Sequence, residues 1–374
     1  MGKISEITKG SGISKDQLSE QGSPCILYGE LYTKYKSEII GEVYSRTELD
    51  SSSLVKSKAN DVIIPCSGET AIDISTARCV PFNNILLGGD LNIIRLKNDD
   101  GGFFAYQLNG VRKTDIARVA QGVSVVHLYG ENLKQITVYH PTIEEQKKIT
   151  RLLSLIDERI ATQNKIIEKM ESLIKGLSQR LLSPKQGWTS YKLDELCQIK
   201  SGYSGIQVSF QTAYKVSRIE TISNHCINMS RIGFVKEIPQ EYKLSVGDIL
   251  FSNINSVQYI GNTAFIDKDY GLYHGMNLLR IVPDSRIVFP RFIHLLLCSE
   301  RLLRHFQSIC NKAVSQASIN QTSLGKTMMT IPSYKEQQHI CSIIESVERK
   351  LDIETSLLKM LQYQKQYLLR QMFI

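Results

Sequence analysis

The chain has 374 residues, of which 42% are hydrophobic and 22% are charged, a composition typical of globular proteins with ordinary cores. No apolar run approaches the roughly 18–20 residues that a membrane span requires, and the first residues lack the apolar segment of a secretory signal, so we expect neither a membrane protein nor a secreted one. The formal net charge of +8 is compatible with nucleic-acid binding but does not establish it.

The eight cysteines are scattered along the chain without a C-x-x-C pair. This pattern predicts reduced, buried thiols and a cytoplasmic protein, because disulfides are rare in that compartment. His294 and Cys298 are four residues apart on an expected helix, so their side chains would share one face. Since no second pair of ligands accompanies them, packing in a core is favoured over metal binding.

Residues 1–140 combine short β-rich runs with glycine, asparagine and serine. Runs such as DVIIPCSG (61–68) and NNILLGGDLNIIRL (83–96) predict strands, and we therefore expect a mixed α/β domain.

A long helix is predicted over residues 141–185. It begins at Pro141, which suits a first helical turn, and continues through the pair Glu145–Gln146. Apolar residues then recur at alternating steps of four and three, the heptad pattern of a coiled coil. The positions are Ile149, Leu153, Ile156, Ile160, Ile167, Met170, Ile174, Leu177 and Leu181, with Gln163 as the polar member.

Residues 186–331 predict a second β-rich domain, with a helix over Pro290–Gln307. Three of its segments resemble segments of the first domain: KLDEL (192–196) matches KISEI (3–7), GDILFS (247–252) matches NDVIIP (60–65), and NLLRI (277–281) matches NIIRL (92–96). The order of the segments is the same in both halves, which indicates an internal repeat.

Residues 332–374 repeat the long helix, 191 residues after the first copy. The proline and the Glu-Gln pair recur, and the heptad positions stay in register. These positions are Ile340, Ile344, Val347, Leu351, Glu354, Leu358, Leu361, Lys365, Leu368 and Met372.

The two long helices can bury each other's apolar seams. Because the second domain lies between them in the sequence, we expect an α+β fold in which they pair as an antiparallel coiled coil with pseudo-twofold symmetry. Each seam spans about 33 residues, or roughly 50 Å at 1.5 Å per residue. Gln163 and Glu354 occupy matching seam positions, and we predict that they fix the register at a cost in stability.

The sequence contains no catalytic signature. A phosphate-binding G-x-x-x-x-G-K-[ST] loop is missing, because Asn320 stands where the leading glycine would precede Gly325. Zinc-protease and nucleophile-elbow motifs are absent, as is the Asp/Asn-Pro-Pro-Tyr/Phe tetrapeptide of base-methylating enzymes. We therefore expect a binding or targeting subunit that is not an enzyme.

The order of domain, helix, domain and helix, with a Pro-x-x-x-Glu-Gln start to each helix, resembles the specificity subunit of type I restriction-modification systems. The segment QYQKQYLLRQMF (362–373) is similar to the usual ending of that family. The segments at 9–35 and 125–138 look like parts of its first target-recognition domain, and the segment at 247–266 looks like part of the second. The resemblance covers essentially the whole chain.

This resemblance implies two target-recognition domains, at residues 1–140 and 186–331, that each read one half of a split double-stranded DNA sequence. The helices at 141–185 and 332–374 would fix the gap between the halves and dock two methyltransferase subunits. Restriction and translocase subunits would complete the complex. No cofactor or metal is expected in this chain; S-adenosylmethionine, ATP and magnesium are expected in the partners, which methylate adenine N6 or cleave DNA.

Candidate DNA contacts are the cationic, amide and hydroxyl side chains of expected loops, because such groups bind phosphates and base edges. In the first domain they are Tyr28, Tyr32, Lys34, Lys36, Ser67, Arg78, Arg112, Lys113, Arg118 and Gln121. In the second domain they are Lys200, Tyr203, Ser204, Asn253, Asn255, Gln258, His274, Lys312, Ser315 and Gln316. The amide run at 253–258 suits bidentate reading of adenine.

Two other interpretations remain open at this point. The chain could be a coiled-coil adaptor whose globular domains bind proteins, or an enzyme of unrecognised type. The helix repeat alone does not separate a DNA-recognition subunit from an adaptor, whereas neighbouring genes for an adenine methyltransferase and a helicase-nuclease would.

Overall fold

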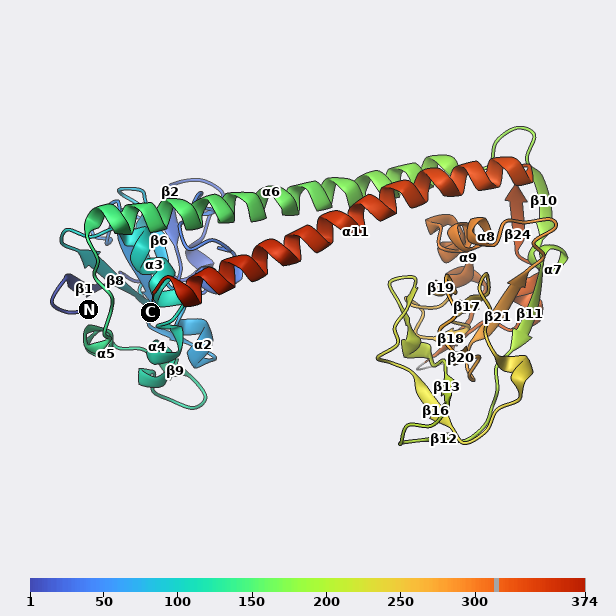
Figure 1. The fold of residues 1–374 in the computed structure, drawn as a ribbon. Helices are drawn as coiled ribbons and strands as arrows, with labels where there is room; N and C mark the ends of the chain where they lie inside the picture. The colour runs from blue at the N-terminus through green and yellow to red at the C-terminus, as the bar shows by residue number, and fades with distance from the viewer. Residues whose placement is uncertain (313–315, 374) are drawn as a thin grey trace. The chain divides into compact units, whose positions relative to one another are not determined.

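The computed structural model describes residues 1–312 and 316–373 and is drawn in Figure 1. Its contacts divide the chain into two compact units. Unit 1 consists of Met1–Ile166 and Glu354–Ile374, and unit 2 of Ile167–Ile353. Two helices contribute residues to both units, namely α6 (Ile143–Leu181) and α11 (Tyr334–Gln371). Within the described residues, every helix is too short or too polar to cross a lipid bilayer.

Unit 1 has a core on both faces of one antiparallel sheet. The strands are β1 (Ser5–Lys9), β8 (Leu91–Leu96), β4 (Asp61–Pro65) and β6 (Arg78–Val80), hydrogen-bonded in the order β1-β8-β4-β6. Successive side chains of a strand point to opposite faces. Val62 and Ile64 enter one apolar cluster, whereas Ile63 enters another. Because both faces are covered, β4 reads in the sequence as an unbroken apolar run.

Helix α3 (Gly101–Asn109) packs between the sheet and the long helices of unit 1. It starts at Asp100, whose carboxylate accepts a hydrogen bond from the Phe103 amide at 2.7 Å. Phe103 shares an apolar cluster with Leu153 of α6 and Leu369 of α11. The other elements of unit 1 are η1 (Lys15–Gln17), β2 (Ser23–Ile26), α1 (Glu30–Thr33), β3 (Ser45–Thr47), β5 (Ser67–Gly68), α2 (Ala71–Ile74), β7 (Leu86–Leu87), α4 (Lys113–Val119), β9 (Val126–His127) and α5 (Gly130–Gln135).

Unit 2 repeats the main sheet. Its strands β11 (Cys197–Ser201), β21 (Leu279–Pro283), β17 (Ile249–Phe251) and β19 (Thr263–Phe265) are bonded in the order β11-β21-β17-β19. Two of the three sequence matches fall on corresponding strands, but not always in the structural register. The third does not, because KISEI runs into β1 whereas Leu193–Leu196 of KLDEL form α7, before β11. Val62 of β4 pairs with Ile94, and Ile249 of β17 pairs with Ile281. Ile281 is thus the counterpart of Ile94, two residues beyond the position that the NLLRI match gives.

The predicted helix over Pro290–Gln307 is two helices, α8 (Pro290–Leu297) and α9 (Glu300–Ile309). The chain breaks because Ser299 is extended, at φ −66° and ψ 142°, and its side chain caps α9 by accepting from the Leu302 amide. The other elements of unit 2 are β10 (Thr189–Lys192), α7 (Leu193–Leu196), β12 (Gln207–Val208), β13 (Tyr214–Val216), η2 (Ile219–Thr221), β14 (Ile222–Ser223), β15 (Cys226–Ile227), β16 (Gly233–Val235), η3 (Gln240–Tyr242), β18 (Ile254–Asn255), β20 (Leu272–Tyr273), β22 (Asn311–Lys312), β23 (Ala317–Ser318), α10 (Gln321–Gly325) and β24 (Met328–Ile331).

Both units contain the same close crossing of two backbone segments after the first strand of the main sheet. A Cβ atom on Gly10 would lie 1.9 Å from the Gly88 carbonyl oxygen, and one on Gly202 would lie 1.9 Å from the Gly275 carbonyl oxygen. Isolated parallel bridges, Ser11 with Gly88 and Tyr203 with Gly275, mark the two crossings. Only glycine fits at such a distance, so the crossing is a structural signature of the repeat.

The heptad seams of α6 and α11 are confirmed, because each of the twenty predicted positions is buried or half-buried. In unit 1 the Gln163 side chain bonds Glu354, and Asp157 pairs with Lys365. The residue numbers run in opposite directions along the two helices, so their pairing in unit 1 is antiparallel. In unit 2 the end of α6 meets the start of α11, where Leu182 shares a cluster with Ile340. The predicted α+β fold with an internal repeat is thereby confirmed.

Candidate nucleic-acid interface

A small sheet in unit 1 brings together candidates that are far apart in the sequence. Strand β5, which contains Ser67, pairs with β9 at Val126 and His127. Gln121 lies beside the same sheet, because its backbone bridges to His127. The Tyr32 hydroxyl is 3.7 Å from the point where a Cβ on Gly68 would lie. Tyr32, Ser67 and Gln121 therefore form one cluster, which we call the unit 1 cluster.

The equivalent sheet in unit 2 gathers three more candidates. Strand β18 pairs with β23, setting Asn255 opposite Ala317, and β23 pairs with β22, setting Lys312 opposite the same residue. Gln316 directly precedes β23 and is exposed, as is Lys312. We call Asn255, Lys312 and Gln316 the unit 2 cluster. Ser315, also predicted here, lies outside the described residues.

The amides of the 253–258 run have different roles. Asn253 donates through Nδ2 to the Ile319 carbonyl at 3.3 Å and so ties β18 to the segment after β23. Asn255 donates through Nδ2 to the Ser252 hydroxyl at 3.1 Å and accepts from the Ser256 amide at 2.8 Å. These two bonds orient the Asn255 amide and leave it one further hydrogen and one further lone pair, the pair of groups that an adenine edge requires. Gln258 is exposed in the turn after β18.

Arg78 is a core residue, contrary to the prediction of a DNA contact. It is 7% exposed, and its guanidinium donates to the carbonyl oxygens of Leu31 (3.1 Å) and Tyr35 (2.8 Å). These bonds hold the segment around α1 against β6.

His274 is also buried, at 1% exposure, and its Nε2 lies 3.0 Å from the Leu278 carbonyl oxygen. Burial lowers the pKa of His274 to about 4, so the ring is neutral near pH 7. It packs at the Gly202–Gly275 crossing, and it is not available to a ligand on the surface.

Several predicted cations of unit 1 have partners inside the unit. Lys34 pairs with Glu30 at 2.6 Å, Arg112 with Asp115 at 3.3 Å, and Arg118 with the same aspartate at 3.3 Å. Burial lowers the pKa of Lys113, whose ammonium lies 3.3 Å from the Thr76 hydroxyl. Of these side chains Arg118 is the most exposed, at 78%, so its charge remains accessible.

The remaining candidates occupy open positions. Tyr28 is half-buried just before α1, and Lys36 is exposed just after it, so the predicted loop contains a helical turn. In unit 2, Lys200 and Ser204 are exposed, and Tyr203 is half-buried with its ring 5.3 Å from that of Tyr242.

One glutamine fixes the start of each long helix. The sequence did not reveal this role. Gln146 accepts from the Asp100 amide at 2.8 Å and donates to the Pro141 carbonyl at 2.9 Å. Gln337 accepts from the Phe289 amide at 2.8 Å and donates to the Pro332 carbonyl at 3.0 Å. Each glutamine thus ties a long helix to the helix that covers its sheet. The recurring Glu-Gln pair in the sequence was the signal that could have revealed this role.

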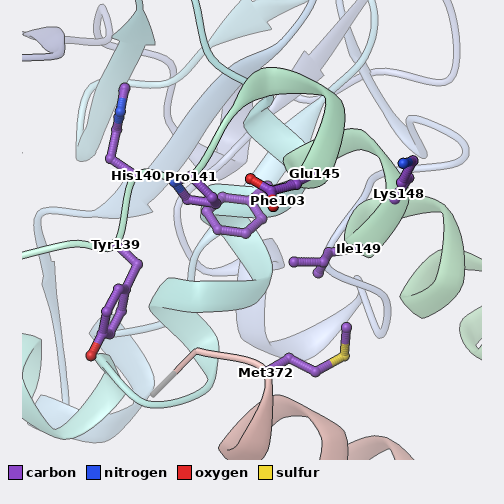
Figure 2. A pocket seen from close by; sticks show the side chains of 8 residues that line it. All are labelled: Phe103, Tyr139, His140, Pro141, Glu145, Lys148, Ile149 and Met372. Carbon is purple, nitrogen blue, oxygen red and sulfur yellow. The ribbon is translucent and has the colours of Figure 1, made fainter.

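A pocket of about 530 Å³ lies in unit 1 where α6 begins and α11 ends. Figure 2 shows Phe103 of α3, Glu145 of α6 and Met372 at the end of α11 around it. The lining is mainly apolar, with the charges of Glu145 and Lys148 at its side on α6.

The predicted pair His294 and Cys298 lies in unit 2 beside His225. Cys298 Sγ is 3.5 Å from His294 Nε2 and 3.3 Å from His225 Nδ1. The other ring nitrogen of His294 is 3.0 Å from the Arg291 guanidinium, which leaves that nitrogen as the acceptor and Nε2 protonated. Among the described residues no group of such side chains is arranged to hold a metal ion.

Comparison with known proteins agrees with these features. The family model for the type I restriction modification DNA specificity domain matches residues 1–172 and 185–363. A Methanocaldococcus jannaschii protein assigned as the MjaX specificity subunit of a type I restriction enzyme is 32% identical over 194 residues, 50% of this chain and 46% of that protein. The MjaVIII specificity subunit of the same organism is 22% identical over 331 residues, 79% of this chain and 74% of that protein. The chain thus spans less than half of the first relative.

Solved structures share the fold. The S subunit of a type I restriction-modification system from M. genitalium has a TM-score of 0.63 at 17% identity, covering 100% of this chain and 94% of that one. A chain from a structure concerned with complex assembly and conformational transition of the type I restriction-modification system has a TM-score of 0.60 at 15% identity, covering 98% and 95%. With a family match over nearly all of its length, the chain belongs to the type I restriction modification DNA specificity domain family.

Proposed function

We propose that this chain is the non-catalytic DNA-recognition subunit of a type I restriction-modification complex and that it reads a bipartite sequence. The observation that carries the proposal is the pair of clusters at equivalent positions. The β5-β9 sheet of unit 1 and the β18-β23-β22 sheet of unit 2 both present amide and hydroxyl groups from residues distant in the sequence. Such groups on short loops and edge strands are suited to reading base edges.

Exposed positive charge in both units supports binding to the DNA backbone. Lys312 is exposed within the unit 2 cluster, Lys200 is exposed on β11, and Arg118 stands out from α4 in unit 1. Such cations bind phosphates without regard to sequence, and they make affinity depend on salt. The base-reading amides and the phosphate-binding cations would then divide specificity and affinity between them.

The partners follow from the same proposal. The repeated helices α6 and α11 offer two matched surfaces, which suits docking of two copies of one methyltransferase subunit, with restriction subunits added to that core. S-adenosylmethionine, ATP and magnesium would be bound by those partners. The complex would act in the cytoplasm, where the eight free cysteines of this chain would stay reduced.

The protein-binding adaptor is not favoured, because the relatives are specificity subunits and the clusters are polar. Copurification separates the two functions. The full chain, tagged in its own host, should bring down an adenine methyltransferase, and the host DNA should carry N6-methyladenine in one bipartite sequence. A normal methylation pattern after deletion of the gene would refute the proposal.

A single amide tests the reading of one half-site. Asn255→Ala removes both groups that face an adenine edge, and a bidentate contact of this kind discriminates by about 1–3 kcal/mol. We expect methylation of sites that carry one changed base pair in one half-site to rise about 10-fold or more relative to the unchanged site. Changes in the other half-site should still prevent methylation. Sequencing of modified bases in the host measures both.

The matched control is Asn164→Ala, which removes an exposed amide that bonds only the Ile160 carbonyl of α6. Its methylation motif should equal that of the unaltered chain. If Asn255→Ala also left the motif unaltered, Asn255 would have no part in recognition.

A further inference from the structure

The chain before β9 forms a closed turn that holds its tip in place. The Gln121 amide donates to the His127 carbonyl at 2.9 Å, and the His127 amide donates to the Gln121 carbonyl at 2.7 Å. Gly122 has a φ of +117°, which a larger residue would adopt only under strain. The residues between Gln121 and His127 are therefore presented on a fixed base. Figure 1 shows β9 on the side of unit 1 that faces away from α6.

This turn carries a row of exposed apolar and aromatic side chains. Val123 is 96% exposed, Val125 52% and Tyr129 46%, and His127 stacks on Tyr129 with ring centroids 6.2 Å apart. The alternate residues Val126 and Leu128 are buried, so Val125, His127 and Tyr129 lie on the exposed side of this segment, and Val123 lies in the exposed bend just before it. Single exposed valines are ordinary on protein surfaces, but several exposed apolar and aromatic side chains within seven residues indicate a surface that binds another molecule.

The surroundings of these side chains favour contact with base edges over contact with phosphates. Ile72 of the adjacent helix α2 is 51% exposed and extends the apolar surface. Glu69 and Asp73 lie close enough to raise the pKa of Tyr32, after the larger effect of its burial and that of Tyr28. Carboxylates repel the DNA backbone, so a DNA surface here must make its contacts inside a groove. The equivalent strands of unit 2 instead expose Lys312 and Gln316.

We propose that Val123, flanked by Val125, recognises a thymine through its 5-methyl group in the half-site that unit 1 reads. The inference rests on the proposed function. That methyl group is the one apolar feature of a base pair in the major groove, and small apolar side chains are its ordinary partners. Every half-site that contains an adenine offers a thymine on the opposite strand. Unit 1 would thus read partly by apolar contact, and unit 2 by hydrogen bonds.

Deoxyuridine tests this contact directly, because it differs from thymidine only by the missing methyl group. The recognised sequence is first read from the methylated adenines of the host. Duplexes with deoxyuridine at one thymine position at a time are then bound to the complex purified through the full chain. We expect one position to lose affinity about fourfold, the value of one buried methyl group.

Val123→Ala supplies the second arm of the experiment. The variant should bind the intact duplex more weakly and should no longer distinguish deoxyuridine from thymidine at that one position. Val246→Ala is the matched control, since Val246 is 62% exposed in the turn before β17 of unit 2. It should keep the full fourfold difference.

The outcomes separate the inference from the proposed function. The complex could bind the recognised sequence more tightly than other DNA while the effects of deoxyuridine and of Val123→Ala are independent at every thymine. In that case the methyl contact does not exist, and the proposed function is unaffected. If the complex shows no sequence preference, the proposed function itself fails.

Discussion

Buried polar side chains hold the sheet of each unit in a defined place. Asp61 bonds the Arg95 guanidinium through both oxygens, at 2.9 and 2.7 Å, and Asp248 lies 2.6 Å from Arg280. In the same unit as Arg280, the His274 ring is enclosed at the crossing of two backbone segments. A neutral imidazole in such a position makes stability depend on pH, because over a range of acidic pH the unfolded chain binds a proton and the folded chain does not.

We predict that unit 2 loses stability as the pH falls from about 6.5 to about 4. The pKa of His274 is about 4 when folded and near its ordinary value of 6.5 when unfolded, so the unfolded state takes up the proton first. The contribution is complete above pH 6.5 and amounts to about 3 kcal/mol. Between pH 6.5 and 4, the free energy of unfolding from urea titrations should fall by this amount more in the wild type than in His274→Gln, which keeps a donor but does not titrate. Equal decreases would contradict the assignment.

The residues that sequence reasoning placed wrongly share one physical cause. Arg78 and His274 were chosen as polar residues near glycine or strand ends, and both are buried with backbone carbonyls as partners. Sequence periodicity around a single residue does not show which long-range carbonyl will reach it. The amides and hydroxyls of the two clusters were identified by residue type, but their grouping depends on strand pairs such as β5 with β9.

At the scale of elements, the long helices were the most predictable part of the fold. A heptad pattern is local and repeats many times, so it identifies the seam without knowledge of the partner. The boundary between α8 and α9 was missed because the apolar periodicity of 290–307 continues through the cap at Ser299. Two of the three segment matches fell on corresponding strands, but short apolar strands allow a shift of two residues that keeps each side chain on its face. The KLDEL match was wrong, because Leu193–Leu196 form a helical turn.

The polar pair in the helix seam gives an element-scale prediction. Gln163 is 6% exposed and donates to the Glu354 carboxylate at 2.6 Å and to the Glu354 carbonyl at 3.1 Å. Gln163→Leu removes both bonds, leaves the half-buried Glu354 carboxylate beside an apolar side chain and should lower the free energy of unfolding by about 1–3 kcal/mol. Adding Glu354→Leu should restore or exceed wild-type stability, because this position of the seam becomes apolar on both helices.

The double variant also tests whether the pair fixes the register. Without the polar pair at this position, alternative alignments become more competitive, so we expect sedimentation to show additional association states that the wild type lacks. A double variant that is more stable and stays in one state would show that Gln163 and Glu354 do not set the register.

At the scale of the whole molecule, the repeat separates what is shared from what differs. Both units have the same order of sheet strands, the same glycine crossing and the same glutamine at the start of a long helix. They differ in the exposed side chains at the two small sheets, which include Val123, Val125 and Tyr129 in unit 1 and Lys312 and Gln316 in unit 2. A shared framework with different exposed side chains suits two domains that recognise different DNA sequences and are joined to matched helices.

Under the proposed function, helix length determines the gap between the two half-sites. One heptad inserted after Ile160 of α6, together with one after Leu357 of α11, keeps the seams in phase and lengthens each helix by roughly 10 Å. We expect the gap in the methylated sequence to grow by about three base pairs at 3.4 Å each. A four-residue insertion in α6 alone should disturb the seam and reduce methylation. An unchanged gap in the heptad variant would exclude the helices as its determinant.

Unit 1 contains both early and late residues, whereas unit 2 is one continuous segment, Ile167–Ile353. Phe373 packs against Phe103, with ring centroids 5.2 Å apart, inside the same cluster as Met1. During synthesis on the ribosome, every residue of unit 2 is therefore made before the last contributors to the core of unit 1. Unit 1 emerges first but closes last, and until then the apolar face that α11 covers is exposed to chaperones and to other nascent chains.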